Sequence, residues 1–92
     1  MTTSFDKLRE LLAKETFPLT FTFKVVGRST EAFRNGAREL ESLHPGLKLT
    51  ATRDSAQGNH VSLTYIHEAE SAEIIIAVYR SIQALPDVLF ML

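Results

Sequence analysis

The order of apolar and polar positions repeats once along this chain. Residues 21–50 run from an alternating segment through a helical segment to a second alternating segment, and residues 61–92 repeat this order. Alternation with a period of two is typical of strands that bury one face, whereas apolar residues three and four positions apart are typical of amphipathic helices. Pro45 and Pro86 separate helix from strand at corresponding places in the two copies. Each copy is therefore predicted to form a strand, a helix and a second strand.

The predicted strands carry apolar residues at alternate positions. The inward positions are Leu19, Phe21, Phe23 and Val25, then Leu47, Leu49 and Ala51, then Val61, Leu63 and Tyr65. The positions predicted to form an exposed polar face are Thr20, Thr22, Lys24, Thr50, Thr52, Ser62 and Thr64. Residues 55–59 are typical of a hairpin turn in which Gly58 is left-handed.

Two long helices and one short helix are also predicted. The first long helix is expected to begin at the N-cap Ser29, and the second at Ser71. Their inward stripes are Phe33, Ala37, Leu40 and Leu43 in the first, and Ile75, Val78, Tyr79 and Ile82 in the second. The short helix is predicted over residues 4–14, because Thr3 and Asp6 have the spacing of a capping box.

Two such units joined by a hairpin predict an α+β protein, a ferredoxin-like βαββαβ sandwich. Crossover connections between parallel strands are almost always right-handed, so both helices should lie on one face of a four-stranded antiparallel sheet. We expect a single domain over residues 1–92, in which residues 1–16 are an N-terminal helical extension. A chain of this length can build one hydrophobic core.

The last predicted strand, residues 88–92, is apolar on both faces. It should lie at an edge of the sheet, where an exposed apolar strand promotes association. Leu89 and Met91 should therefore be covered, either by the N-terminal helix or by a second subunit. These two residues are a candidate interaction surface.

Composition excludes several classes of function. Lys and Arg number ten and Asp and Glu eleven, so the formal net charge is −1 and bulk attraction to a polyanion is not expected. The absence of cysteine excludes disulfides, thiol catalysis and thiolate metal sites. No apolar run reaches the roughly 18 residues that span a bilayer, and the first 15 residues carry charges throughout. We therefore expect a cytoplasmic protein with no membrane association.

The residues also resemble those of a known family, the small bacterial YbeD-like proteins. The likeness lies in LRELL and FPLTFTFKVVG, in His44-Pro45-Gly46, and in the hairpin residues Ser55, Gly58, Asn59, Ser62 and Thr64. This chain departs from the family at His60, where an aromatic residue is common, and after Pro86, where it is more apolar. The resemblance implies a ferredoxin-like domain similar to ACT-type regulatory domains, and it implies no catalytic residues.

The best candidate site is the loop between the first strand and the first long helix, at Gly27, Arg28, Ser29 and Thr30. Backbone N–H groups and the positive end of a helix dipole can bind an anion at such a place, and Lys24 could add charge. ACT-type domains bind small effectors near this loop, although the Asp-x-x-Gly pattern often seen there is absent here. An ordinary capped turn with a solvated Arg28 is the alternative.

Metal binding and hydrolysis have little support in the sequence. His60 and His67 are seven residues apart beside one strand and should point to opposite faces, whereas His44 ends a helix. No Gly-x-Ser-x-Gly motif is present to carry a hydrolase nucleophile.

RNA-recognition domains share this strand order and stack bases on aromatic side chains of the central strands. Here the corresponding outward positions hold only His60, Ser62 and Thr64. Nucleic-acid binding is therefore not expected, and a weak RNA-binding domain using Lys24, Lys48 and Arg53 is a third hypothesis.

We expect a non-enzymatic regulatory module that binds a small anionic metabolite or a protein partner, with no cofactor and no metal. The alternative is a ligand-free domain for protein interaction or homodimerisation through its last strand.

Overall fold

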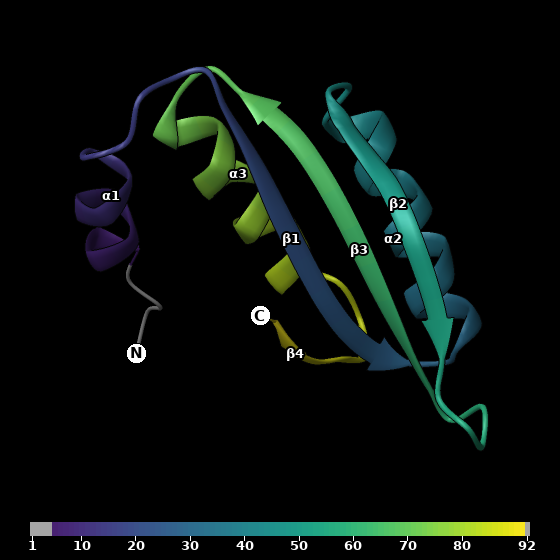
Figure 1. Ribbon diagram of the computed structural model, residues 1–92. Helices are drawn as coiled ribbons and strands as arrows, with labels where there is room; N and C mark the ends of the chain where they lie inside the picture. The colour runs from purple at the N-terminus through teal and green to yellow at the C-terminus, as the bar shows by residue number, and fades with distance from the viewer. Residues whose placement is uncertain (1–4, 92) are drawn as a thin grey trace.

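The computed structural model describes residues 5–91. After a short helix, the elements follow the predicted βαββαβ order (Figure 1). They are α1 (Asp6–Leu12), β1 (Leu19–Arg28), α2 (Glu31–Leu43), β2 (Leu47–Asp54), β3 (His60–Ala69), α3 (Ala72–Gln83) and β4 (Val88–Met91). The predicted α+β fold is confirmed.

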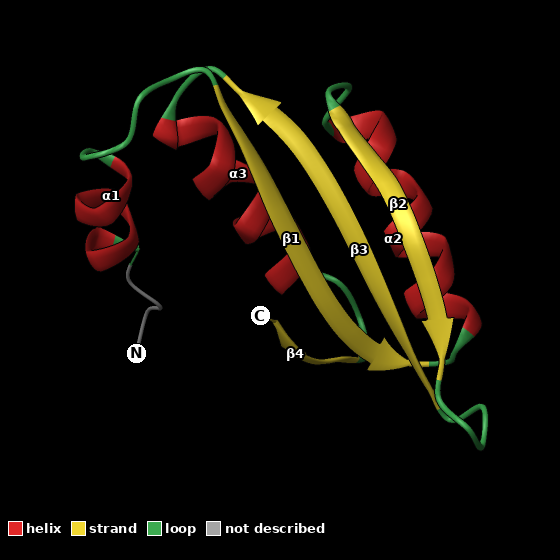
Figure 2. Ribbon diagram, in the orientation of Figure 1, coloured by secondary structure: helices red, strands yellow, loops and turns green. Residues whose placement is uncertain are grey.

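The four strands form one antiparallel sheet in the order β2-β3-β1-β4. Helices α2 and α3 lie together on one side of this sheet (Figure 2). The opposite side, called here the open face, is not covered by any helix of residues 5–91. No helix in that range is long and apolar enough to cross a membrane.

The core lies between the sheet and these two helices. Phe23 and Val25 of β1, Phe33 of α2 and Ile75 of α3 are fully buried. Every second side chain of β1 and β3 points into this layer. The helices contribute the side chains that are three and four residues apart. The inward residues predicted for β3 and for α3 are confirmed, except that Tyr79 is only partly buried.

Strand β2 differs from the prediction beyond its first residues. The register with β3 shifts between Leu49 and Ala51, so Ala51 pairs with Thr64 and Thr52 pairs with Leu63. A bulge adds one residue to a strand, and every later side chain changes face. Thr52 therefore points inward, contrary to the prediction, and Ala51 points outward. Leu49 stays 40% exposed.

The first turns of the helices also differ from the prediction. The N-cap of α2 is Thr30 rather than Ser29, and its side chain accepts a hydrogen bond from the Phe33 N–H. Ser71 is the N-cap of α3, as predicted, but its side chain makes no capping bond. Helix α1 is preceded by the N-cap Phe5 and is shorter than predicted; Thr3 lies outside the described residues. In α2, Leu43 is 66% exposed, so the predicted stripe ends one turn earlier.

Helix α1 packs on α3 and not on β4. The Phe5 ring lies 6.4 Å from the Tyr79 ring, and Arg9 Nε donates to Glu73 Oε1 at 2.8 Å. Leu89 remains 40% exposed, so the expectation that the N-terminal helix covers it is wrong for the described residues.

Strand β4 also pairs irregularly with its neighbour. Phe90 pairs with Val26, whereas Val88 pairs with Gly27, which leaves Leu89 in a bulge. Met91 consequently packs against the core of its own chain rather than lying on the predicted interaction surface, and Phe90 is 51% exposed.

Candidate binding surface on the open face

The predicted loop at residues 27–30 has its polar groups engaged within the fold. The Arg28 N–H donates to the Asp87 carbonyl at 2.9 Å and the Ser29 N–H to the Asn59 carbonyl at 3.0 Å. The Thr30 N–H donates to the Arg28 carbonyl at 2.8 Å. These three N–H groups are therefore already satisfied without a ligand.

The side chains of this loop are engaged too, and two carboxylates lie beside them. Thr30 Oγ1 donates to Asp87 Oδ2 at 2.7 Å. The Arg34 guanidinium donates to Ser29 Oγ at 2.7 Å and to Asp54 Oδ1 at 3.0 Å. Nearby negative charge opposes an anion, so this geometry favours the capped-turn alternative. The ligand-binding role of the loop stays a prediction.

Lys24 and Arg28, the two cations proposed for that loop, lie on the open face instead. Side chains alternate along β1, and Gly27 and Val25 face the core. Across the sheet, Lys24 is paired with Thr64 and Arg28 with His60. The side chains of these two cations therefore point away from the N-terminus of α2, where the anion was expected to bind.

Between the two cations, a row of outward residues crosses all four strands. Val26 of β1 pairs with Ser62 of β3 on one side and with Phe90 of β4 on the other. Ser62 in turn pairs with Arg53 of β2. We call the resulting surface the open-face patch, comprising Lys24, Val26, Arg28, Arg53, His60, Leu89 and Phe90. Val26, Phe90 and Leu89 form its apolar centre. These three side chains line a shallow pocket of about 330 Å³.

The charges in the patch are mainly positive, although the Asp54 carboxylate also lines its hollow. Lys24, Arg28 and Arg53 surround the apolar centre. Thr64 and Ala51, the next outward residues on β3 and β2, are uncharged. Glu68 lies further along β3, opposite Thr20. The Asp54 carboxylate is paired with the Arg34 guanidinium at 3.0 Å, which offsets its charge.

Sequence reasoning placed Lys24, Arg28 and Leu89 at candidate surfaces but missed Val26 and Phe90. Val26 follows Val25 in an apolar pair, and only the pairing of β1 shows which of the two faces outward. Phe90 alternates with Leu89 and Met91, and the bulge reverses that alternation. The remaining signal was the doubly apolar character of residues 88–92.

His60 and His67 lie on opposite faces of the sheet, as predicted, whereas His44 lies near His67. His60 lies on the open face, whereas His67 pairs with Phe21 on the helix side. His44 Nε2 lies 2.8 Å from Ser81 Oγ, and burial lowers the His44 pKa, with His67 adding to the effect. Within residues 5–91, no three His, Asp or Glu side chains are grouped closely enough to hold a metal ion.

Comparison with known proteins gives one family and a shared fold. Residues 13–92 match the family described as "Protein of unknown function (DUF493)". The chain is 32% identical over 91 residues to the UPF0250 protein IL0958 of Idiomarina loihiensis, with 98% of this chain and 97% of that protein covered.

Two solved structures are similar in fold. Protein HP0495 from H. pylori has a TM-score of 0.66 at 17% identity, covering 100% of this chain and 97% of its own. The C-terminal domain of the MgtC protein from Mycobacterium tuberculosis has a TM-score of 0.54 at 13% identity, covering 85% of this chain and 88% of its own. The family match and the curated relative decide the classification: this chain belongs to the DUF493 (UPF0250) family, which confirms its resemblance to the YbeD-like proteins.

Proposed function

We propose that this protein is a non-enzymatic interaction module whose open-face patch binds an acidic, partly apolar segment of a partner protein. The observation that carries this proposal is the exposure of Phe90 and Leu89 inside a set of cations, on the side of the sheet that the helices leave open. Aromatic side chains in desolvated centres supply much of the energy of protein interfaces. Charges around such a centre guide the encounter and select partners of opposite charge.

The same charges disfavour dimerisation of two copies through their open faces. Two copies meeting face to face would bring Lys24, Arg28 and Arg53 of each close to those of the other. Like charges placed together across an interface cost several kcal/mol. A partner with glutamates or aspartates around an apolar residue satisfies both parts of the patch.

The small-metabolite and RNA hypotheses have weaker support. The anion-binding donors expected at residues 28–30 already have partners in the fold. Among the outward residues of the central strands β1 and β3, only His60 carries a ring on which a base could stack.

An NMR titration tests the proposal. The probe is a blocked hexapeptide with a central leucine–phenylalanine pair flanked by glutamates, added to ¹⁵N-labelled protein. We expect shifts at the amides of Val26, Ser62 and Phe90, with an affinity of about 1 mM or tighter, that weakens as salt is raised. The variants Phe90→Ser and Arg53→Gln should each weaken binding, whereas Leu43→Ser, which removes an exposed leucine from α2, should not.

Two outcomes would overturn the proposal. One is the absence of open-face shifts at millimolar peptide. The other is equal binding of a peptide in which lysines replace the glutamates, because charge would then play no part. Tighter binding of single-stranded RNA at the same amides would identify RNA, and not an acidic segment, as the ligand. Shifts that depend on protein concentration without any ligand would identify a second copy of the chain.

A further inference from the structure

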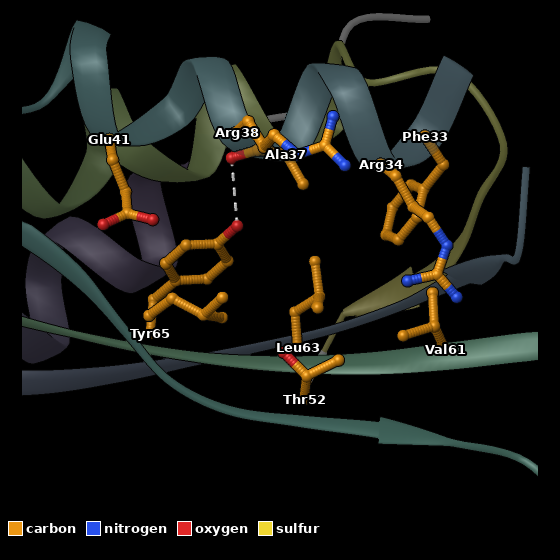
Figure 3. A pocket seen from close by; sticks show the side chains of 10 residues that line it. Phe33, Arg34, Ala37, Arg38, Glu41, Thr52, Val61, Leu63 and Tyr65 are labelled. Carbon is orange, nitrogen blue, oxygen red and sulfur yellow. Dashed lines mark hydrogen bonds between the residues drawn. The ribbon is translucent and has the colours of Figure 1, made fainter. Parts of the chain in front are cut away.

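A second hollow lies on the other side of the sheet, between α2 and strands β2 and β3 (Figure 3). Its volume is about 200 Å³. The floor is apolar and comes from Phe33 of α2 and from Val61, Leu63 and Tyr65 of β3. These four side chains are buried, so the hollow reaches the core layer of the protein.

The hollow exists because β2 contributes few large side chains to this layer. Leu47 is the only residue of β2 that is buried. After the register shift, the inward position opposite Leu63 is Thr52, whose side chain is small. On the helix side the facing residue is Ala37, which is smaller still. Leu49 of β2 also lines the hollow but stays 40% exposed, so the side chains of β2 and α2 do not fill the space between them.

The rim of the hollow is charged and has two different ends. Arg34, Arg38 and Glu41 all project from one side of α2, since they are four and three residues apart. Figure 3 shows Glu41 above Tyr65 at one end and Arg34 near Val61 at the other, with Arg38 between them. An anion entering the hollow would be repelled by Glu41 and drawn toward the arginines.

Arg38 is the better placed of the two arginines to bind a ligand. Arg34 already donates to Ser29 Oγ and Asp54 Oδ1. Arg38 Nη1 donates to Asn35 Oδ1, at 2.7 Å, on the exposed surface of the same helix. Exchanging that contact for a carboxylate would give Arg38 a charge-assisted pair beside an apolar floor.

At the Glu41 end of the hollow, the Tyr65 hydroxyl already donates its proton within the fold. The Tyr65 hydroxyl donates to the Ala37 carbonyl at 3.1 Å, and burial together with Glu41 raises the Tyr65 pKa to about 12. Tyr65 therefore stays neutral and presents its ring to the hollow. This end suits an uncharged, apolar part of a ligand.

We propose that this hollow binds a small monocarboxylate with a flat apolar body, its carboxylate against Arg38 and its body over Leu63 and Tyr65. Sites for drug-sized ligands usually enclose about 300–1,000 Å³, so the smaller volume here points to a single ring or a short branched chain. The site is separated from the open-face patch by the sheet. The proposal therefore does not rest on the proposed protein interaction.

The experiment uses 4-fluorobenzoate as the probe, with ¹⁵N and ¹⁹F NMR on the whole chain. We expect saturable shifts at the amides of Ala37, Thr52 and Leu63, and none at Val26 or Phe90. Because the pair with Arg38 is charge-assisted, Arg38→Gln should weaken binding roughly tenfold. The neutral analogue 4-fluorobenzamide should be weaker by a similar factor. Lys48→Gln, a matched loss of one charge on the outward side of β2, should leave the affinity unchanged.

A variant that fills the hollow gives a second check. Thr52→Phe places a ring in the space and should abolish the shifts, provided that the spectrum of the variant remains dispersed. The proposal is overturned if 4-fluorobenzamide binds as tightly as 4-fluorobenzoate, if Arg38→Gln binds like the unaltered protein, or if the shifts centre on another surface. None of these three readouts needs the Thr52 variant, so a folding defect there would not decide the matter.

Discussion

The ring of Phe33 occupies the space that a side chain on Gly27 would need. A Cβ built on Gly27 would lie 2.6 Å from Phe33 Cζ, closer than real side-chain contacts allow. Phe33 is fully buried, and Gly27 lies within β1, so neither residue has room to withdraw. Gly27 therefore allows the first turn of α2 to pack directly on β1, which gives this predicted site residue a packing role.

The change Gly27→Ala should lower the free energy of unfolding by about 1–3 kcal/mol, because the added methyl overpacks a filled core. Urea denaturation followed by circular dichroism would measure the loss. Gly36→Ala is the matched control. There the new Cβ meets the end of the Leu85 side chain at 2.9 Å, which can turn aside, and the helix gains about 0.5–1 kcal/mol in propensity. Equal losses in the two variants would contradict the packing role of Gly27.

Tyr65 makes a hydrogen bond that should contribute measurably to stability. Its hydroxyl donates to the Ala37 carbonyl in a buried setting. Tyr65→Phe should therefore reduce the free energy of unfolding by about 0.5–1.5 kcal/mol. Tyr79→Phe keeps a ring that packs on Phe23 at 5.1 Å and should cost less. The same urea experiment compares the two variants. A larger loss of unfolding free energy for Tyr79→Phe than for Tyr65→Phe would contradict the expected contribution of the hydrogen bond from Tyr65 to the Ala37 carbonyl.

The fold was predictable from the sequence because periodicity decides the type of each element. In β1 and β3 the alternation runs without interruption, so the inward residues of these two strands, such as Phe23 and Tyr65, were placed correctly. In β2 and in β4, one bulge in each strand moves the side chains of all later residues to the opposite face of the sheet. Bulges depend on how two distant strands pair, and Thr52 and Phe90 carry no local sign of them.

The candidate site was harder to predict for a related reason. Gly27 to Thr30 has the local chemistry of an anion-binding loop, but Asp87, which accepts hydrogen bonds from the Arg28 N–H and the Thr30 hydroxyl, lies 57 residues from Thr30 in the chain. Asp54, which binds Arg34, lies 20 residues from it. The availability of a donor is a property of the folded protein, and local sequence motifs do not contain it.

Helix α1 is attached to α3 by a surface ion pair whose loss should act locally. Arg9 donates to both carboxylate oxygens of Glu73, and this hydrogen bond raises the Arg9 pKa and lowers that of Glu73. Exposed pairs contribute little to global stability, so Arg9→Gln should increase amide exchange in α1 by only about two- to threefold. Exchange in β1 and β3 should not change. Lys7→Gln, on the same helix, is the control, and faster exchange throughout the sheet in Arg9→Gln would contradict a local role.

His44 should make stability depend on pH in a definite direction. Burial lowers its pKa in the folded protein below the ordinary value of about 6.5, and the nearby His67 lowers it further. The unfolded chain therefore takes up the proton at a higher pH than the folded protein does. The contribution of His44 to stability is complete above about pH 6.5 and is lost as the pH falls through the lowered folded value. Thermal unfolding measured at pH 7.5 and at pH 5 should show this loss of stability. His44→Gln, which can still hydrogen-bond Ser81, should reduce the difference between the two pH values. The control His60→Gln, on the open face, should leave the difference unchanged. If His44→Gln keeps the full difference between the two pH values, the groups responsible lie elsewhere in the protein.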